Sequence, residues 1–406
     1  MFSLNIKSLF LGCVILIASK IAVVESSLIS NLGGIIGDVL TNATSFVQDP
    51  LTKTLCKLTT DQLITHYGYL AEKHYVITED GYNLTLFRCN SNETSSGTKK
   101  AVVLQHGILE SSDDFTTHDP SQALAYVMAD AGYDVWITNS RGNFYSRRHI
   151  SLSPDQRAFW NFSWTEIGLY DLSAIYDYVI EQTQNEKVYA IGHSQGTTSP
   201  IVLLSEKPEY NEKIAAAALM APVGYVGNSG APWQALSKIR RLQELFKDTE
   251  FLPRGSFSEL SSDFCNVIEV GICEGIINGL FGPSEGETNE TMLPSHLCHV
   301  TSGASLNQAI HYGQEIEYGY FGPYKTGSEI PRDFNFSQIT APMSFHYSPV
   351  DTFTDTTDVD RLTSQIKSIA FVQVINETKF NHIDFMWGIH AAPLVYSRIL
   401  EFFESI

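Results

Sequence analysis

Short apolar segments alternate with longer segments of helical spacing from about residue 101 to the end of the chain. The short segments are rich in Val, Ile, Leu and Ala and are bounded by polar residues or Gly, which is typical of buried strands. Strands are predicted at 101–105, 134–138, 188–191, 214–220, 342–347 and 371–375, and helices at 122–131 and 165–182. This alternation predicts an α/β fold with a mostly parallel sheet flanked by helices.

One long insertion interrupts the alternation. It runs from about residue 222 to 338, and its part 251–281 is rich in Leu, Ile, Phe and Val. The pattern therefore predicts one core, formed by 59–221 and 339–406, that carries a separate insertion at 222–338. Residues 27–58 form an N-terminal segment before this core.

The N-terminus has the organisation of a secretory signal peptide. An apolar run from Leu9 to Ala18 follows a short polar start and gives way to Ser19, Lys20 and small residues. A membrane-spanning helix needs about 20 apolar residues, so residues 1–26 are interpreted as a cleaved signal. No second long apolar run follows, and we expect no transmembrane anchor and a location outside the cell or in the lysosomal lumen.

The composition excludes two classes of protein. The chain has 406 residues, of which 43% are hydrophobic and 12% aromatic, enough to fill a large core and unlike a disordered chain. Its 45 acidic residues outnumber its 26 basic ones, for a net charge of -19, so nucleic-acid phosphates would repel it.

A secretory context changes the meaning of the cysteines and of the Asn-x-Ser/Thr sequons. Removal of the signal leaves five cysteines, so at least one thiol has no partner within the chain. The sequons are candidate glycosylation sites. Those retained are Asn42, Asn92, Asn161, Asn289, Asn335 and Asn376, while Asn83 lies in a strand-like segment and is the weakest candidate.

The strand 188–191 runs directly into Gly192-His193-Ser194-Gln195-Gly196 and then into an apolar helical stretch. This order of a strand, a Gly-x-Ser-x-Gly motif and a helix is that of a nucleophile elbow. In a nucleophile elbow a sharp turn presents the serine hydroxyl at the end of a sheet. The glycines allow neighbouring backbones to approach closely. Ser194 is therefore the candidate nucleophile, and the alternative is an ordinary glycine turn with a solvated serine.

A serine nucleophile requires a histidine base and a carboxylate that orients it. Asp351 follows the strand 342–347, and His382 lies on a loop after the last predicted strand; these are the predicted acid and base. Spacing alone does not exclude other candidates, since an aspartate after a strand commonly caps the next helix. The rivals are Asp355, Asp358, Asp360, Asp384 and His390, with Asp355 the strongest.

The tetrahedral intermediate also needs backbone N–H donors for its oxyanion. Gln195 supplies the first, directly after the serine, and Ile108 supplies the second from the His-Gly turn that follows the strand 101–105. His296, Cys298 and His299 are residue types that bind zinc, but no further ligand cluster lies nearby in the sequence, so no zinc site is expected there,. No metal and no cofactor is expected.

These residues resemble the acid lipases of the α/β-hydrolase fold, the family of gastric and lysosomal acid lipases and their insect relatives. The resemblance covers about Thr59 to Phe403. Its matching stretches are His66-Tyr-Gly-Tyr, Thr78-Glu-Asp-Gly-Tyr, Leu104-Gln-His-Gly, Gly132-Tyr-Asp-Val-Trp, Asn139-Ser-Arg-Gly-Asn, Gly192-His-Ser-Gln-Gly-Thr-Thr and Asn381-His-Ile-Asp-Phe. It implies the same nucleophile, acid, base and oxyanion donors, and it implies that the insertion is a cap with a lid.

Two departures from the family pattern concern the acid and the cap. Ser348-Pro349-Val350 precede Asp351 where glycines are usual. The family's cap disulfide resembles Cys265 and Cys273, with a spacing about one residue shorter. Eight helical residues would separate these two cysteines by about 12 Å, and bonded Cα atoms lie about 5.5–6 Å apart. A bond between them requires the chain to turn, and Gly271 is a place where it could.

The resemblance implies a lipase that hydrolyses esters of neutral lipids, triacylglycerols or sterol esters, at a lipid–water interface. A near alternative is a carboxylesterase that acts on smaller soluble esters. An alternative from another class is a lipid-binding glycoprotein on an inactive lipase scaffold. The joint presence of Ser194, Asp351 and His382 argues against the binding protein, which has no need of all three.

Overall fold

The computed structural model describes residues 50–406 except 93–97, 239–244, 256–269 and 377–378. The predicted signal peptide 1–26, the sequon at Asn42 and Cys265 lie outside these residues. The predictions made for them stay predictions.

A sheet of eight strands forms the centre of the molecule, in the order β1-β2-β4-β3-β5-β6-β9-β10. The first two strands pair antiparallel to each other, and β2 pairs antiparallel to β4. All other neighbours are parallel, so the predicted α/β fold is confirmed. The strands are β1 Leu70–Ile77, β2 Asn83–Asn90, β3 Ala101–Gln105, β4 Asp134–Ile137, β5 Val188–His193, β6 Ile214–Met220, β9 Met343–Tyr347 and β10 Ile369–Val374.

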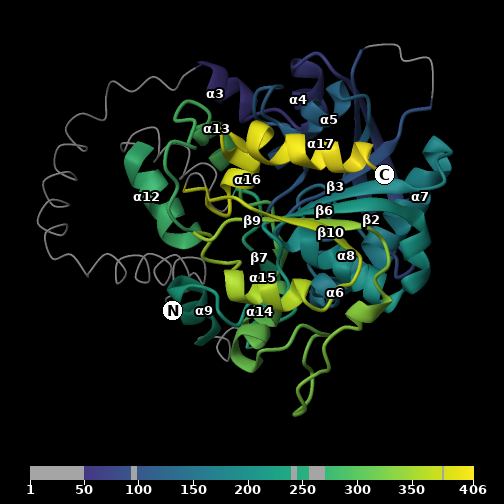
Figure 1. Ribbon diagram of the computed structural model, residues 1–406, viewed down its shortest axis with the longest axis vertical. Helices are drawn as coiled ribbons and strands as arrows, with labels where there is room; N and C mark the ends of the chain where they lie inside the picture. The colour runs from purple at the N-terminus through teal and green to yellow at the C-terminus, as the bar shows by residue number, and fades with distance from the viewer. Residues whose placement is uncertain (1–49, 93–97, 239–244, 256–269, 377–378) are drawn as a thin grey trace, which may run out of the picture.

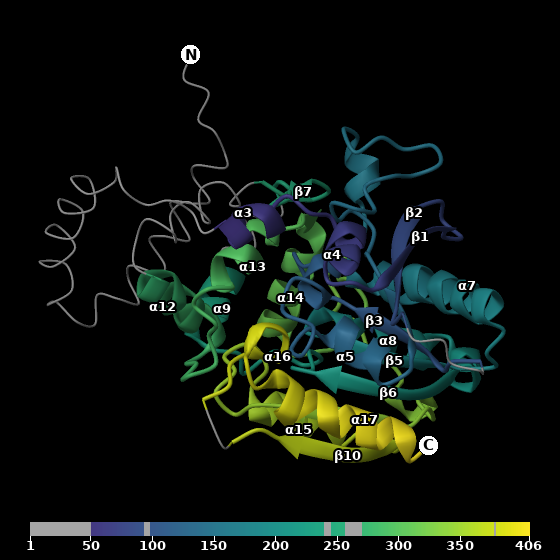
Figure 2. The same ribbon diagram turned by 90° about the horizontal axis from the view of Figure 1, so that it is seen from above.

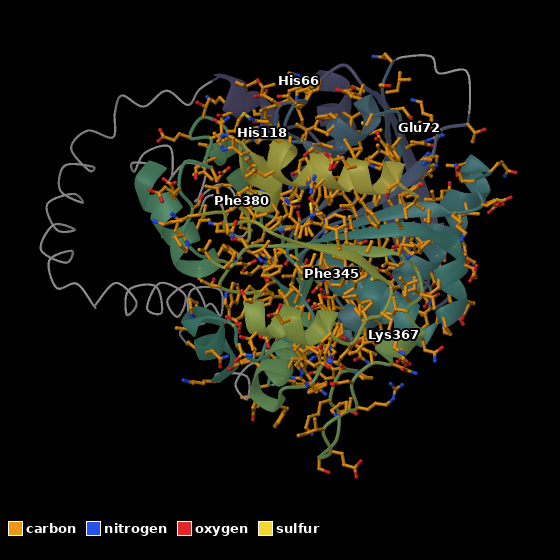
Figure 3. All side chains as sticks on the ribbon, viewed as in Figure 1. His66, Glu72, His118, Phe345, Lys367 and Phe380 are labelled. Carbon is orange, nitrogen blue, oxygen red and sulfur yellow. A yellow bond between two sulfur atoms is a disulfide. The ribbon has the colours of Figure 1, made fainter. Side chains whose placement is uncertain are left out.

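Helices cover both faces of the sheet because successive side chains of a strand point to opposite sides. In β3, Val103 faces a core shared with α7 (Ser173–Thr183) and α8 (Gln195–Glu206). Val102 and Leu104 face the other core, with α5 (Leu124–Asp130) and α17 (Ser397–Glu404). Figure 1 shows α5 and α17 on one side of the sheet and α8 on the other. Side chains fill the layers between, with Phe345 of β9 in the interior (Figure 3).

The predicted helices differ slightly from those observed. The helix predicted at 122–131 is α5 and is shorter, and the one predicted at 165–182 begins at Trp164 and continues through a wider π-helical stretch, Ile167–Leu172, into α7. Gly168 in this stretch lies against α8, where an added Cβ would stand 2.8 Å from the Ser199 carbonyl oxygen. The remaining described α-helices of the core are α4 Thr60–His66, α6 Trp164–Glu166, α15 Thr356–Thr363 and α16 Asp384–Trp387, and α3 Pro50–Leu55 lies in the N-terminal segment.

Between β6 and β9 the chain leaves the sheet for residues 222–338, which we call the cap segment. Its helices α9, α12 and α13 gather at one end of the molecule, away from α7 (Figures 1 and 2). Among the described helices, none is long and apolar enough to cross a membrane. The elements of the cap segment are α9 Ala231–Lys238, β7 Glu250–Phe251, α12 Val270–Phe281, α13 Leu293–His299, β8 Ala304–Ser305 and α14 Leu306–Tyr318.

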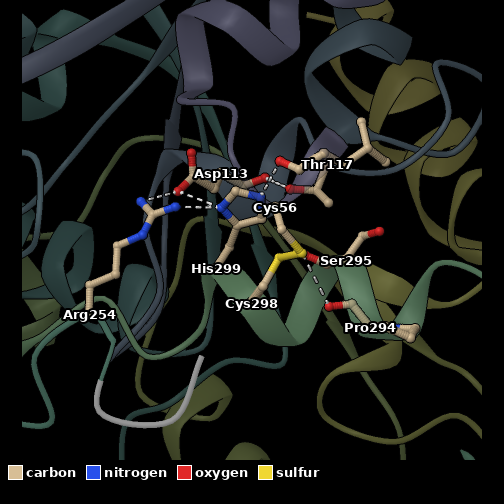
Figure 4. Close-up of a disulfide and its surroundings, with 9 residues drawn as sticks. Cys56, Asp113, Thr117, Arg254, Pro294, Ser295, Cys298 and His299 are labelled. Carbon is tan, nitrogen blue, oxygen red and sulfur yellow. Dashed lines mark hydrogen bonds and ion pairs between the residues drawn. A yellow bond between two sulfur atoms is a disulfide. The ribbon is translucent and has the colours of Figure 1, made fainter. Parts of the chain in front are cut away.

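A disulfide between Cys56 and Cys298 joins the N-terminal segment to the cap segment, with Cα atoms 5.6 Å apart (Figure 4). The sequence did not indicate this pair, which lies 242 residues apart. Cys298 is thus a disulfide partner. Cys89 is a free thiol buried in β2, and burial raises its pKa to about 12. The predicted bond of Cys273 involves Cys265, outside the described residues.

A buried cluster of polar groups beside this disulfide connects the same parts of the chain. Asp113 accepts hydrogen bonds from Thr60 Oγ1 at 2.6 Å, Tyr145 OH at 2.7 Å and Arg254 Nη1 at 2.8 Å. His299 lies within 3.3 Å of the same carboxylate (Figure 4). Burial favours the neutral acid, but Arg254 and His299 hold the pKa of Asp113 below its ordinary value,. This ion pair of Asp113 and Arg254 therefore ties the cap segment to the core.

The described sequons differ in exposure. Asn289 is half-buried, and its side chain accepts a hydrogen bond from the Thr291 N–H. Accessible side chains suit glycan transfer, so the exposed sequons are the stronger candidates. These are Asn92, Asn161, Asn335 and Asn376.

Several carboxyl groups are buried in surroundings that favour the neutral acid. Burial raises the pKa of Asp384 to about 7, and burial together with the charge of Glu110 raises that of Asp114 to about 8. The pKa of Glu315 on α14 is raised well above its ordinary value, first by burial and then by Asp333. The native state keeps these protons while the unfolded chain loses them above about pH 4. Each such group therefore lowers the free energy of unfolding as the pH rises from about 4 towards its native pKa.

Replacing Glu315→Gln should remove one part of this pH dependence. At about pH 4 the variant and the wild type should be equally stable, because both side chains are then neutral. Above that pH the wild type should lose about 1.4 kcal/mol per pH unit relative to the variant, until the pH reaches the native pKa of Glu315. Denaturant unfolding between pH 4 and 7 measures the difference. Glu329→Gln, at an exposed position of the cap segment, is the control, and a stability difference that does not change with pH would contradict the interpretation.

Candidate active site

A strained turn carries Ser194 between β5 and α8. Its backbone has φ 54° and ψ -125°, a combination that L-residues other than glycine avoid. The turn is held by hydrogen bonds from the Ser194 N–H to the Met220 oxygen at 3.1 Å and from the Thr197 N–H to the Ser194 oxygen at 2.8 Å. Strain of this kind persists where surrounding contacts fix the backbone, and here it fixes the serine at the end of the sheet.

The two glycines of the motif are required by close backbone contacts. A Cβ on Gly192 would lie 2.1 Å from the Gly196 carbonyl oxygen, and one on Gly196 would lie 2.1 Å from the Gln105 oxygen of β3. No side chain fits at these distances. The turn is thus packed against itself and against the neighbouring strand, as the sequence motif predicts.

The structure brings the predicted nucleophile, base and acid together. His382 Nε2 lies 2.8 Å from Ser194 Oγ, and His382 Nδ1 lies 2.7 Å from Asp351 Oδ2. All three residues are buried, with 4%, 2% and 5% of their surface exposed for Ser194, His382 and Asp351. The Asp351 carboxylate only accepts hydrogen bonds, so Nδ1 of His382 carries a proton and donates it to Asp351. Nε2 is then free to accept the proton of the Ser194 hydroxyl. The arrangement can activate a serine hydroxyl for attack on a carbonyl.

Asp351 is held by a complete set of donors. Its Oδ1 accepts from the N–H groups of Phe353 at 2.7 Å and Thr354 at 3.0 Å, and its Oδ2 accepts from Thr354 Oγ1 at 2.6 Å. These bonds, with the one from His382, fix the carboxylate in the direction of the imidazole. The sequence Ser348-Pro349-Val350 before it does not displace the acid.

The rival acids have other partners. Asp355 caps α15 by accepting from the Thr357 N–H at 2.7 Å, as expected for an aspartate after a strand. Asp358 is bound to Asn228 and Asp360 is exposed. Spacing in the sequence could not separate them from Asp351.

The residues that flank His382 are also engaged elsewhere. Asp384 accepts from the Asn381 N–H at 2.6 Å and so closes the loop that carries the histidine. His390 pairs with Glu287 at 3.2 Å, and 53% of its side chain is exposed. Neither competes with His382 for Ser194.

The predicted oxyanion donors lie at two turns next to Ser194. The N–H of Gln195 begins α8, where the helix dipole favours negative charge, and Ile108 follows the turn after β3. Within the described chain, neither N–H donates to a protein acceptor. Both are therefore free for a substrate oxygen, and their role in binding an oxyanion stays a prediction.

His106 shapes the turn that carries Ile108. Its Nδ1 lies 2.7 Å from the Gly107 oxygen, and its Nε2 accepts from the Ser140 N–H at 3.0 Å. Nε2 can accept the Ser140 N–H only when the His106 ring is neutral. Burial favours this neutral ring, because it lowers the pKa of His106,. The sequence marked the His-Gly pair but did not reveal Ser140 as its partner.

The cap segment closes over the site. The ring of Phe281, at the end of α12, stacks on His382 with centroids 5.7 Å apart. The Phe281 oxygen accepts from the N–H groups of Thr352 at 3.3 Å and His382 at 3.4 Å. From α14, Gln308 accepts a hydrogen bond from the Gln195 side chain at 2.7 Å. These contacts attach the cap segment to the loops of both the acid and the base, and to the residue after Ser194.

Gly196→Ala should lower turnover at this site by at least about 100-fold. The added Cβ would overlap the Gln105 oxygen, so either the turn or β3 must move, and displacements near 1 Å can cost about 100-fold in turnover. Gly279→Ala in α12 is the matched control, because nothing lies within 4 Å of that Cβ. The measurements are turnover of a soluble ester and the melting temperature of both variants. Full activity of Gly196→Ala would show that the turn is not packed as described.

Two family models match the chain. The partial α/β-hydrolase lipase region matches residues 60–119, and the α/β-hydrolase fold matches residues 100–265. Among solved structures, the esterase from Exiguobacterium antarcticum is similar with a TM-score of 0.51 and 13% identity. The similarity covers 82% of this chain and 100% of the esterase. This likeness concerns the fold.

Curated relatives match over most of the chain. Lipase 1 of Drosophila melanogaster is 35% identical over 359 residues, which cover 85% of this chain and 79% of that protein. The lysosomal acid lipase/cholesteryl ester hydrolase of Homo sapiens is 33% identical, over 84% of this chain and 89% of that protein. The gastric triacylglycerol lipase of Rattus norvegicus is 31% identical, over 84% and 90%. By its fold, its site and these relatives, the chain belongs to the acid lipase family of α/β hydrolases and is a carboxylic ester hydrolase.

Proposed function

We propose that this protein hydrolyses neutral lipid esters, triacylglycerols or sterol esters, through an acyl-enzyme intermediate on Ser194. The observation that carries the proposal is the position of His382, which lies 2.8 Å from Ser194 Oγ and 2.7 Å from Asp351 Oδ2. The substrate class is supported by the printed names of two relatives, a cholesteryl ester hydrolase and a triacylglycerol lipase.

The geometry supports a two-step mechanism. Ser194 Oγ attacks the ester carbonyl carbon while His382 Nε2 takes the hydroxyl proton. The negative charge on the former carbonyl oxygen is stabilised by the N–H groups of Ile108 and Gln195. His382 then gives its proton to the leaving alcohol, and Asp351 stabilises the imidazolium throughout. Water repeats the sequence on the acyl-enzyme and releases the fatty acid.

The cap segment supports a lipid rather than a small soluble ester as substrate. Phe281 of this segment stacks on His382, Gln308 holds the Gln195 side chain next to Ser194, and Ser194 itself is buried. We therefore infer that this packing opens to admit the substrate. Burying acyl chains gains about 0.8 kcal/mol per CH₂, which makes an apolar cap an effective selector for long chains. We therefore assign residues 222–338 as a cap and lid over a core formed by 59–221 and 339–406.

The proposed location is outside the cytosol, in the extracellular space or the lysosomal lumen. The Cys56–Cys298 disulfide is typical of an oxidising compartment,. The N-terminal signal 1–26 and the exposed sequons are consistent with the same route. Two relatives are named for the lysosome and the stomach.

Ser194→Ala should abolish hydrolysis of both a short soluble ester and an emulsified long-chain triacylglycerol. A loss of at least about 1000-fold is expected, because the nucleophile itself is removed. The assays compare the purified wild type and variant from acidic to neutral pH, with the melting temperature as a check on folding. Serine-dependent activity on the soluble ester alone would identify a carboxylesterase. Absence of activity in the folded wild type would favour a lipid-binding protein.

Asp351→Asn should lower turnover by about 10,000-fold, because an amide at that position holds the imidazole in the wrong tautomer. Asp355→Asn is the matched control on the same loop, since asparagine can still cap α15. The control should keep wild-type turnover and stability. Steady-state kinetics on the soluble ester test both variants, and the opposite pattern would assign the acid to Asp355.

A further inference from the structure

His193, the residue before Ser194, connects the turn that carries the serine to the loop that carries the base. His193 is the last residue of β5, and its ring is wholly buried. Its Nε2 lies 2.9 Å from the backbone oxygen of His382. A carbonyl oxygen only accepts hydrogen bonds, so Nε2 carries a proton and donates it to this oxygen.

The other ring nitrogen of His193 meets Glu110, which belongs to a third segment. His193 Nδ1 lies 3.0 Å from Glu110 Oε1 and 3.2 Å from Oε2. Glu110 Oε2 also accepts the Gly107 N–H at 2.6 Å. Glu110 is thereby attached to the turn that carries Ile108, and a Cβ on Gly107 would lie only 2.8 Å from its carboxylate. One ring therefore joins the serine turn, the histidine loop and the oxyanion turn.

Both ring nitrogens of His193 face acceptors, the His382 oxygen and the Glu110 carboxylate. Each nitrogen must therefore carry a proton to form its hydrogen bond, which makes the ring an imidazolium beside a carboxylate. Burial of the ring opposes its charge, but Glu110 raises the pKa of His193 above its ordinary value. Burial likewise opposes the charge of Glu110, and His193 holds the pKa of Glu110 below its ordinary value.

The other titratable groups around the pair leave its charges balanced. The pKa of His106 is lowered by burial, so that ring is neutral. The pKa of Asp114 is raised, first by burial and then by the charge of Glu110. The ring of His382 has its centroid 5.2 Å from that of His193. The His193–Glu110 pair is thus one positive and one negative charge, buried among polar groups.

We propose that His193 and Glu110 are a positioning pair, which sets the distances between Ser194, the His382 imidazole and the Ile108 N–H without touching the substrate. The proposal rests on the roles assigned to these groups under the proposed function. The three groups come from three separate segments, and a catalytic constellation must be held to within about 0.5 Å. A buried contact shared by all three segments fixes them relative to one another, and the His193–Glu110 pair is such a contact.

Substitutions of His193 and Glu110 should therefore lower kcat more than substitutions elsewhere that cause the same loss of stability. His193→Gln keeps an amide donor near the position of Nε2, and His193→Asn keeps one near Nδ1, so each retains half of the connection. Glu110→Gln keeps an acceptor for the Gly107 N–H and removes the charge. Each variant should lose about 10- to 100-fold in kcat on a soluble ester, with KM changed by less than about threefold.

The control is His346→Gln on β9. This ring is also wholly buried and hydrogen-bonded through both nitrogens, to Ser344 at 2.9 Å and Gln373 at 2.7 Å. The His346→Gln variant should lower the melting temperature as much as the His193 variants do, and its kcat should equal that of the wild type. The double variant His193→Gln/Glu110→Gln should lose no more activity than the worse single variant, because the two residues act as one unit. Folded His193 variants with kcat within about twofold of the wild type, or a control with the same loss of kcat, would overturn the proposal.

The charge state of His193 tests the pair without reference to activity. In protein labelled with [¹⁵N]histidine, the His193 resonances, assigned by their absence in His193→Gln, should show both ring nitrogens protonated at pH 7. In Glu110→Gln one nitrogen should lose its proton. A neutral His193 in the wild type would overturn the pair even if the enzyme is active. Ester hydrolysis that does not depend on Ser194 would instead overturn the proposed function, and the resonances would still decide the pairing.

Discussion

The backbone contact between the turn after β5 and the end of β3 constrains the whole site. Gly196 lies so close to the Gln105 oxygen that no side chain fits between them. This contact places the start of α8 beside the turn that carries Ile108. The two N–H groups expected to bind an oxyanion are thus neighbours because two segments pack backbone to backbone. Side chains of α8 then fill the core on one face of the sheet, so the turn cannot relax without disturbing that core.

Buried charge connects the site to the rest of the molecule. Asp113 and Arg254 join the core to the cap segment, and the His193–Glu110 pair joins three loops of the site. Buried pairs of this kind add little net stability over apolar residues of the same size, because both charges lose their water. Their effect is geometric, since a buried charge without its partner is costly and the paired arrangement is strongly preferred.

The sequence revealed the local features and missed contacts between distant residues. The strand 101–105, the serine turn and the order of Ser194, Asp351 and His382 were predictable because each has a local pattern of apolar residues, glycines or chain order. Asp351 could be chosen over Asp355 only in space, where one carboxylate faces the imidazole and the other caps a helix. The Cys56–Cys298 bond and the His193–Glu110 pair left no local signal, because their partners are 242 and 83 residues apart. Both depend on the packing of the complete chain.

The distance in sequence between Cys56 and Cys298 has a consequence for how the chain matures. Cys56 is the first cysteine after the predicted signal peptide and Cys89 is the next, so a premature bond between these two could form early in an oxidising compartment. The native sheet prevents this bond, because Cys89 is buried in β2 and its raised pKa leaves almost no reactive thiolate,. Cys56 then remains available for Cys298, which is synthesised only after strands β1 to β6 of the sheet. Formation of the disulfide thus requires that the N-terminal segment and the cap segment have already met.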